Sequence, residues 1–262
     1  MRLPFGMRSS TLQERKQFYG KFDLKKARDW VGRKLVYAMV LGRHTNIFPL
    51  KFKSDKDIPL IIDNYHSLQE VEGAFCHYLP EGVYYDRNYY KDFSKCHTHN
   101  LKKSWGWKNF AGQQLAFDVD PENITCPIHG SLQDRMREGQ GLSFCKEAFQ
   151  IACANVLALY EKFSENYSDV RIVFSGRGFH LHVFDKETIS LTRQERKKIA
   201  HQYSGYGIDT WVTEGEMRLI RLPYSLNAVS SRIVLPLPAS RVLDFDPTRE
   251  ALPEFLKNKR PS

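Results

Sequence analysis

Two aspartates stand at alternate positions in the segment LAFDVD, residues 115–120. In a β-strand, alternate side chains share a face, so Asp118 and Asp120 would lie together, roughly 7 Å apart at the backbone. Carboxylates this close repel each other unless a cation lies between them, and such pairs are typical ligands of divalent cations. The alternative is a strand that simply ends in a polar turn.

A glycine-rich turn with one arginine precedes two histidines in the segment SGRGFHLHVF, residues 175–184. The main-chain N–H groups of such a turn can bind an anion, with Arg177 and His180 pointing toward it. The period of two places His180 and His182 on one face of the following strand. A surface hairpin or a pair of core histidines is the alternative.

A third carboxylate, Asp209, ends the short apolar segment GYGID. The segment EMRLIRLPYSLN, residues 216–227, follows and contains two arginines, a serine and an asparagine. Guanidinium groups suit bidentate phosphate binding, and hydroxyl and amide groups can complete the site. The alternative is a strand with charged edges.

In this order and spacing, the three segments resemble the motifs of the archaeo-eukaryotic primase superfamily, most closely those of the archaeal primase small subunit. The resemblance extends from about Tyr84 to the segment RIVLPL, residues 232–237. It implies that the catalytic Mg²⁺ or Mn²⁺ ions are held by Asp118, Asp120 and Asp209. It implies nucleotide binding by Ser175, Arg177, His180, Arg218, Arg221, Ser225 and Asn227.

The same resemblance implies a fold and an activity. The fold is α/β of the α+β kind, a primase catalytic core with a mostly antiparallel sheet in a single domain over residues 1–262. The activity is that of a DNA-directed primase/polymerase, a nucleotidyltransferase that makes RNA or DNA primers from nucleoside triphosphates. The implied partners are a single-stranded DNA template and, as a candidate, a large primase subunit.

The sequence departs from the family at two places. The turn has one residue fewer between Gly176 and Arg177 than the family's second motif. The family's later motif Ser-Leu-His-Gly-Lys reads SLNAV here, so a histidine becomes Asn227 and the lysine that meets the triphosphate becomes Val229. Arg232 or another basic residue would have to replace that lysine.

Archaeal primase small subunits also carry a zinc-binding insertion just after the acidic pair. The corresponding segment here, residues 121–145, contains Cys126, His129 and Cys145. Thiolate and imidazole suit Zn²⁺, but a structural site needs four ligands, and the family's remaining cysteine is replaced by Leu142. Outside candidates for the fourth ligand are Cys96, His97 and His99. A degenerate knuckle without zinc is the alternative.

Three other functions stay open on the sequence. A repair or end-joining polymerase of the same fold would extend primers without initiating them. A nucleic-acid-binding homologue would keep the fold without the chemistry, as the missing lysine and the short turn favour. A metal-dependent nuclease would use grouped carboxylates but would not need a turn that holds a triphosphate.

The elements that must position these residues are predicted from local patterns. Strands are predicted at residues 113–120, 171–174, 179–184 and 231–237, where apolar and β-branched residues gather between turns. Apolar residues at helical spacing predict a long helix over residues 145–163. Capping boxes begin three more helices, pairing Thr11 with Glu14, Ser67 with Glu70, and Thr192 with Glu195. The polar end, residues 252–262, is predicted to be a loose tail.

Composition supports contact with a polyanion. The 262 residues are 42% hydrophobic and carry a formal net charge of +9, and lysine and arginine release counterions when they neutralise phosphates. The five cysteines, without a secretory signal, argue against a disulfide framework. No apolar run approaches the ~20 residues of a membrane helix, so we expect a cytoplasmic protein that contacts no membrane.

Overall fold

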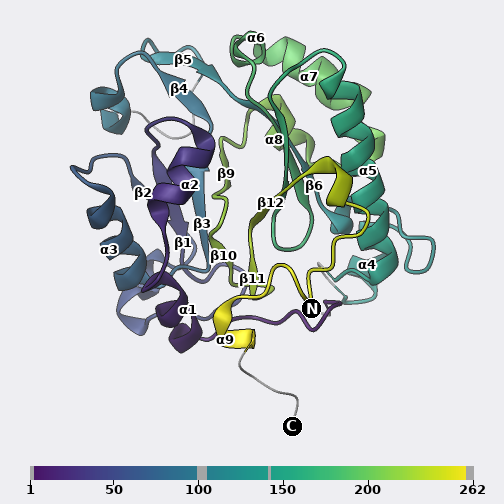
Figure 1. The fold of residues 1–262 in the computed structure, drawn as a ribbon, viewed down its shortest axis with the longest axis horizontal. Coiled ribbons are helices and arrows are strands. Elements are labelled where there is room, and N and C mark those ends of the chain that lie inside the picture. The colour runs from purple at the N-terminus through teal and green to yellow at the C-terminus, as the bar shows by residue number, and fades with distance from the viewer. Residues whose placement is uncertain (1–2, 99–104, 141–142, 258–262) are drawn as a thin grey trace.

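A computed structural model describes residues 3–98, 105–140 and 143–257 and places two four-stranded antiparallel sheets side by side (Figure 1). The first sheet has the order β2-β1-β3-β9, and the second has the order β12-β7-β8-β6. Two short ribbons, β4–β5 and β10–β11, accompany them. The strands are β1 Tyr37–Val40, β2 Leu60–Ile62, β3 Gly82–Asp86, β4 Asn88–Tyr90, β5 Phe110–Gln113, β6 Leu115–Val119, β7 Val170–Phe174, β8 Phe179–Val183, β9 Leu219–Arg221, β10 Leu226–Asn227, β11 Arg232–Ile233 and β12 Leu235–Leu237.

The helices cover the two sheets separately, which confirms the predicted α+β class. Figure 1 shows α1, α2 and α3 on the side of the first sheet, and α5 and α7 on the side of the second. None of the helices within the described ranges has the length and apolarity that crossing a membrane requires. The helices are α1 Leu12–Tyr19, α2 Leu24–Val31, α3 Leu68–Tyr78, α4 Leu132–Arg137, α5 Lys146–Ser164, α6 Lys186–Ile189, α7 Arg193–Gln202, α8 Thr210–Glu214 and α9 Glu254–Lys257.

The predicted helix starts are confirmed, with one difference in the capping. Thr11 and Thr192 form complete capping boxes at α1 and α7. At α3, Ser67 accepts from the N–H of Glu70, but the Glu70 carboxylate accepts from the N–H of His66. The carboxylate reaches one residue further back, so this box lacks its reciprocal half.

Strand β6 has one face in each of the two hydrophobic cores. Leu115, Phe117 and Val119 belong to the core under α5, whereas Ala116 belongs to the core under α1 to α3. The predicted alternation is therefore confirmed. Asp118 shares the Ala116 face, at the boundary between the two cores.

The single strand predicted over residues 231–237 is wrong in one respect, because it divides between two partners. Ile233 pairs with Leu226 in the β10–β11 ribbon, and Leu235 pairs with Phe174 of β7 in the second sheet. Apolar residues along the whole segment predict extended backbone, but the partner of each half depends on tertiary packing.

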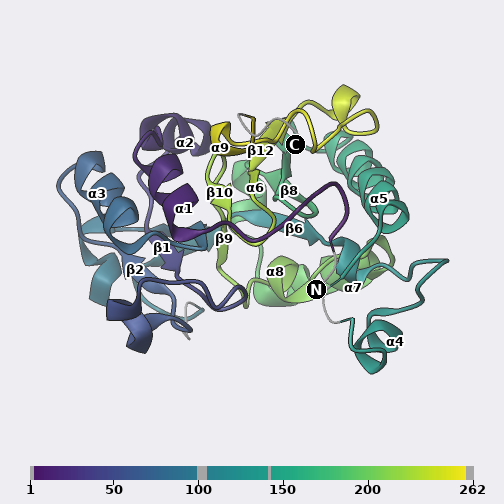
Figure 2. The ribbon, with the colours of Figure 1, turned by 90° about the horizontal axis from the view of Figure 1, so that it is seen from below.

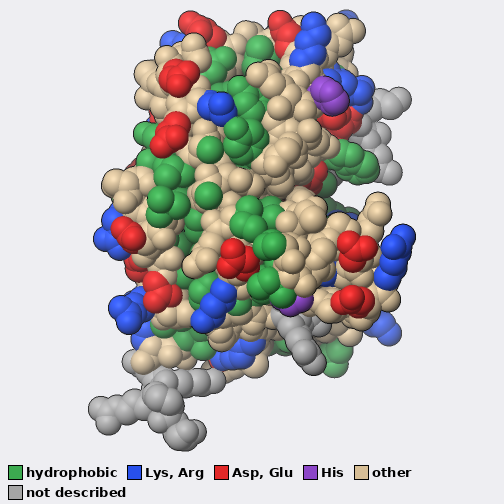
Figure 3. All heavy atoms as spheres, turned by 90° about the vertical axis from the view of Figure 1, so that its right-hand side faces the viewer, with side chains coloured by type: hydrophobic (Ala, Val, Ile, Leu, Met, Phe, Trp, Pro, Cys, Tyr) green, Lys and Arg blue, Asp and Glu red, His purple; other side chains and the backbone are tan. Residues whose placement is uncertain are grey.

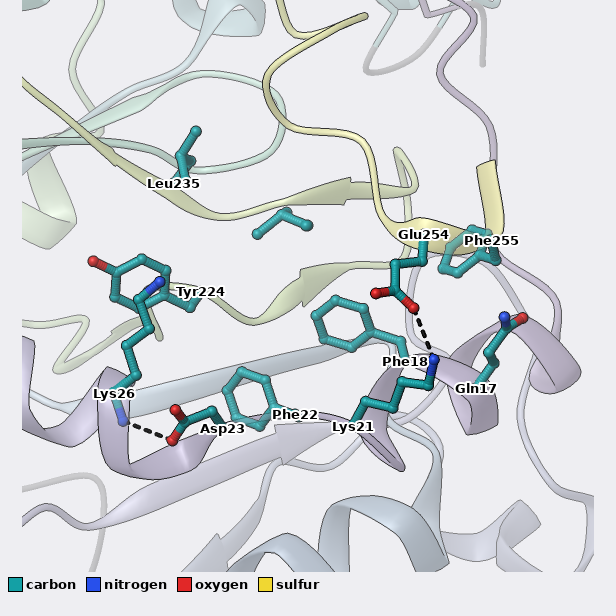
Figure 4. Close-up of a pocket in the computed structure, with 11 residues that line it drawn as sticks. Gln17, Phe18, Lys21, Phe22, Asp23, Lys26, Tyr224, Leu235, Glu254 and Phe255 are labelled. Carbon is teal, nitrogen blue, oxygen red and sulfur yellow. Dashed lines mark hydrogen bonds and ion pairs between the residues drawn. The ribbon is translucent and has the colours of Figure 1, made fainter. Parts of the chain in front are cut away.

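The prediction of a loose C-terminal tail is wrong for the part that the structure describes. Residues Glu254–Lys257 form α9, and the Phe255 side chain is buried in the first-sheet core. Glu254 makes an ion pair of 2.9 Å with Lys21 beside a cavity of about 300 Å³ (Figure 4). A single phenylalanine in a polar segment gives too weak a pattern to predict this docking.

Part of the positive charge lies in the interior of the protein. Five arginines have fully buried side chains, and they donate hydrogen bonds chiefly to main-chain carbonyls: Arg15, Arg87, Arg135, Arg196 and Arg232. On the face covered by α5 and α7, basic and acidic side chains are interspersed (Figure 3). The formal charge of +9 therefore overstates the basic character of the surface.

Candidate active site

The acidic pair at the end of β6 lies beside the second motif on β8. Asp118 is paired in register with His180, and the Asp118 Oδ1 lies 3.5 Å from the His180 Nε2. Both side chains and Asp120 line a pocket of about 300 Å³ whose walls come from both sheets. The antiparallel register therefore brings together two motifs that lie about sixty residues apart in the chain.

Asp209 reaches the same pocket through the segment that leads into α8. Its main-chain N–H donates to the carbonyl of Asp118 at 2.8 Å, and Ile208 forms a bridge to Val119. The Asp209 side chain caps α8 by accepting from the N–H of Trp211 at 2.9 Å. The structure thus brings together all three aspartates predicted as metal ligands.

The electrostatics of this cluster favour a divalent cation. Burial, followed by the charges of Asp120, Asp209 and Glu122, raises the pKa of Asp118 well above its ordinary value. Burial is also the largest cause of the raised pKa of Asp209. Within the described structure, the buried Oδ1 of Asp118 makes no hydrogen bond. A cation would satisfy this atom and relieve the repulsion, and Mg²⁺ and Mn²⁺ prefer carboxylate oxygens.

Sequence reasoning missed a fourth carboxylate, Glu122. Burial and the charge of Asp120 raise the pKa of Glu122 to about 7. The Arg177 guanidinium lies 3.0 Å from Glu122 and 3.6 Å from Asp120. The orientation of the Arg177 side chain is therefore determined by these two carboxylates as well as by the turn that carries it.

The glycine-rich turn packs closely against Asn227 of β10 on one side and Val119 of β6 on the other. Gly176 has φ +99°, and a Cβ there would lie 2.4 Å from the Asn227 side chain. A Cβ on Gly178 would lie 2.4 Å from the carbonyl oxygen of Val119. These close approaches require glycine at both positions and fix the turn against β6 and β10.

Hydrogen bonds within the glycine-rich turn and from Asn227 hold its shape. The Ser175 hydroxyl accepts from the N–H of Gly178 at 3.1 Å, so this donor is used within the turn. The Asn227 amide donates to the carbonyl of Ser175 at 3.0 Å, and its oxygen accepts from the N–H of Val229. Both side chains line the pocket, but their bonds hold the turn.

The two histidines differ in their surroundings. Burial, with the charges of Arg221 and Arg87, lowers the pKa of His180 to about 3, so its imidazole is neutral at pH 7. His182 lies outside the pocket lining and is 3.2 Å from the Tyr85 hydroxyl. Of these two histidines, His180 therefore lines the pocket, and His182 belongs to the buried layer behind it.

Three predicted residues are directed elsewhere. Arg218 makes an ion pair of 2.7 Å with the buried Asp86. The Ser225 hydroxyl donates to the carbonyl of Leu222 at 2.7 Å. Arg232 donates to the carbonyl of Pro247 at 2.8 Å and cannot replace the missing lysine. By contrast, Arg221 and Asn227 line the pocket. The spacing of these residues in the sequence does not show which side chains point into the pocket.

The first third of the chain supplies pocket residues that sequence reasoning did not identify. Arg43, His44 and Tyr84 line the pocket together with the aspartates. The buried carboxylate of Glu81 accepts from the N–H groups of His44 and Thr45, from the Thr45 hydroxyl and from the His44 Nδ1. No local motif marks this loop, because only the packing of the two sheets brings it to the site.

The pairing of Glu81 predicts a pH-dependent contribution to stability. Burial acts to raise the pKa of Glu81, but hydrogen bonds from His44 and Thr45 lower it from 4.5 to about 2. A carboxyl with a lowered pKa stabilises the fold above the unfolded value and loses this effect as the pH falls toward the folded value. We expect Glu81→Gln to lose about 3 kcal/mol at pH 7 and progressively less between about pH 5 and 2. Urea unfolding across this range measures it, and a constant deficit would contradict the assignment.

Cys126, His129 and Cys145 form a compact cluster at the base of the segment that carries α4, which projects from the body (Figure 2). Their ligand atoms all lie within 4.8 Å of one another. Burial acts to raise the pKa of Cys126, but hydrogen bonds from His129, two main-chain N–H groups and Cys145 lower it to about 7. Two thiols and an imidazole so arranged fit Zn²⁺, with one ligand position left for another donor.

Of the outside candidates for a fourth ligand, Cys96 alone has a described side chain, and it does not join this cluster. The Cys96 thiol donates to the carbonyl of Asp63 at 3.2 Å. His99 lies outside the described residues, as does Leu142, and the structure describes only the backbone of His97.

A bound zinc ion would have a measurable stoichiometry. We expect the purified protein to contain about one zinc per chain, and Cys126→Ser to lose it with a fall in Tm, because metal binding is coupled to folding. Elemental analysis and thermal melts with and without a chelator measure both effects. Cys76→Ser, at an exposed cysteine outside the cluster, is the matched control. Zinc-free wild-type protein prepared in zinc-containing medium would identify an empty knuckle.

Comparison with known proteins finds related sequences in one family. The DNA primase small subunit family matches residues 117–207. An uncharacterized DNA primase small subunit-like protein of Archaeoglobus fulgidus is 47% identical over 262 residues, covering 97% of this chain and 94% of that protein. The DNA primase small subunit PriS of Thermococcus kodakarensis is 25% identical over 195 residues, covering 74% of this chain and 49% of PriS.

The polymerase domain of Mycobacterium tuberculosis Ligase D, solved in complex with DNA, has the same fold. It superimposes with a TM-score of 0.51 at 12% sequence identity, covering 96% of this chain and 91% of that domain. The chain spans about half the length of the Thermococcus and Pyrococcus PriS proteins that it matches.

Proposed function

This chain belongs to the archaeo-eukaryotic primase family, and on that premise we propose that it is a template-dependent nucleotidyltransferase that makes primers on single-stranded DNA. The observation that carries the proposal is the convergence of Asp118, Asp120 and Asp209 in one pocket with Arg177, His180 and other basic groups. Transfer of a nucleotidyl group requires carboxylates that hold divalent metal ions and, next to them, basic side chains that bind phosphate groups.

In this proposal, the acidic and the basic residues of the pocket bind different groups. Asp118, Asp120 and Asp209 would hold two divalent cations, which when bound would activate a hydroxyl and neutralise the pyrophosphate leaving group. Arg177 and Arg221 would bind the triphosphate, since guanidinium groups form strong, directed bonds with phosphate oxygens. The neutral imidazole of His180 would hydrogen bond to the nucleotide without competing with the cations.

The test is synthesis on unprimed single-stranded DNA with labelled nucleotides and Mg²⁺ or Mn²⁺. A primed template runs in parallel, and the double variant Asp118→Ala/Asp120→Ala is the control for contaminating polymerases. Product on the unprimed template that disappears in the variant would support a primase. Product only on the primed template would instead indicate a repair-type polymerase. The absence of both would favour a nucleic-acid-binding homologue.

An exposed tryptophan beside the pocket suggests where a nucleic-acid base would stack. Trp211 is 66% exposed and lies two residues after Asp209, the N-cap of α8. Its carbonyl accepts from the N–H of Met217, which lines the pocket and is 43% exposed. Aromatic side chains of this kind bind single strands by stacking, worth about 1–3 kcal/mol per base.

We therefore expect Trp211→Ala to weaken binding of single-stranded DNA by about tenfold, without changing Tm, because the ring is exposed. Fluorescence anisotropy with a labelled oligonucleotide measures the affinity. Leu243→Ala, which removes another exposed apolar side chain, provides the comparison. Equal affinities of the two variants would show that Trp211 is not a stacking platform.

A further inference from the structure

The loop after β1 presents two basic residues to the pocket on the side of the first sheet. Arg43 and His44 line the pocket together with Val40 and Pro59. The carboxylates and Arg177 come from the second sheet and its connections. Basic groups therefore reach the pocket from two independent parts of the fold.

Two buried charges hold this loop in place. Glu81, whose side chain is 2% exposed, binds the His44 and Thr45 backbone, as described above. The fully buried Arg15 of α1 donates to the carbonyls of Leu41 at 2.9 Å and Ile47 at 2.8 Å. Buried charges are costly unless fully hydrogen bonded, and the bonds that these two charges make fix the loop that follows β1.

The same contacts fix the orientation of His44. Because the Glu81 carboxylate accepts at Nδ1, 2.7 Å away, the imidazole carries a proton there and leaves Nε2 as its free nitrogen. The His44 side chain is 40% exposed and lines the pocket, so Nε2 can meet a ligand, and it donates to a phosphate oxygen when it also carries a proton.

The neighbouring guanidinium groups lack acidic partners. Arg43 is exposed, and no carboxylate lies within ion-pair distance of it in the part of the chain that the structure describes. The Arg221 Nη1 is buried without a hydrogen-bond partner there, and its guanidinium lies 4.8 Å from the Tyr84 ring centroid. Gly82 leaves the necessary room, since a Cβ would lie 2.5 Å from that Nη1. Unpaired donors facing a pocket indicate an anionic ligand.

We propose that Arg43 and His44 form a second phosphate subsite, which binds the reactant that carries the attacking hydroxyl. This inference rests on the proposed function, because nucleotidyl transfer joins two phosphate-bearing reactants and that proposal assigns Arg177 and Arg221 to the incoming triphosphate. The phosphate has two possible sources. It is either a backbone phosphate of a primer strand or the triphosphate of the first nucleotide in unprimed synthesis.

The test uses Arg43→Ala, which removes an exposed side chain and should fold normally. Arg249→Ala, at another exposed arginine far along the chain, is the matched control. Anisotropy gives the Kd of primed DNA without nucleotide over a range of salt concentrations. Kinetics give the KM for nucleotides in primed and unprimed synthesis.

A backbone source predicts an approximately tenfold higher Kd for primed DNA and a salt slope reduced by about one in Arg43→Ala. A first-nucleotide source predicts an unchanged Kd, with the nucleotide KM raised about tenfold in unprimed synthesis alone. If Arg43→Ala matches Arg249→Ala in every measurement, the subsite does not exist. If the wild type makes no product, the proposed function fails, and the binding measurement alone decides the subsite.

Discussion

Asp118→Asn is expected to lower nucleotidyl transfer by about 10²–10³-fold while raising the Tm of the metal-free protein by about 2–4 °C. The loss of activity follows because the amide removes the central negative charge of the cluster, which the cations require. The gain in stability follows from the raised pKa of Asp118. Ionising a carboxyl whose folded pKa is raised costs free energy at pH 7, and this cost disappears with the amide.

Two measurements test this pair of effects. Primer extension at saturating nucleotide gives the rate, and thermal melts in a chelator, then in Mg²⁺ or Mn²⁺, give the stability. Cations should raise the Tm of the wild type more than that of the variant, because a ligand stabilises the state that binds it. Asp244→Asn, at an exposed aspartate, is the control. A variant that loses activity and is also less stable would show that Asp118 serves the fold rather than a metal.

Arg87→Met is expected to produce the largest loss of stability, on the order of 3–5 kcal/mol. The buried guanidinium donates to the carbonyls of Gln114 at 2.8 Å, and of Val212 and Met217 at 2.6 Å each. Methionine fills much of the volume but leaves the carbonyls of Gln114 and Met217 without this donor, at about 1–3 kcal/mol each before relaxation, whereas the Val212 carbonyl keeps the N–H of Gly215.

The same substitution should impair the active site, because Arg87 ties α8 to the start of β6. Loosening α8 would displace its cap, Asp209, from Asp118. The stability of Arg87→Lys should fall between those of the wild type and Arg87→Met. A lysine ammonium lacks the planar array of donors with which the guanidinium reaches three carbonyls. Urea unfolding measures the series, with Arg28→Met on the surface as the control. A free energy of unfolding for Arg87→Met equal to that of the wild type would refute this role.

Several features of the fold and of the site can be predicted from the sequence because they depend only on local interactions. The placement of Asp118 and Asp120 on one strand face follows from the period of two, which depends only on backbone geometry. The caps at Thr11 and Thr192 and the buried stripe of α5 likewise depend on neighbours within a few residues. The order of the motifs was enough to indicate the family, and with it the α+β class.

Tertiary structure decided everything that depends on which segments meet. The register of β6 against β8 sets His180 beside Asp118, and the path into α8 brings Asp209 to them. Arg218 resembles Arg221 in sequence, but the buried charge of Asp86 draws it away from the pocket. Arg43 and His44 reach the site only because Glu81 and Arg15 fix their loop from a different part of the chain, and contacts between distant residues leave no periodic signal in the sequence.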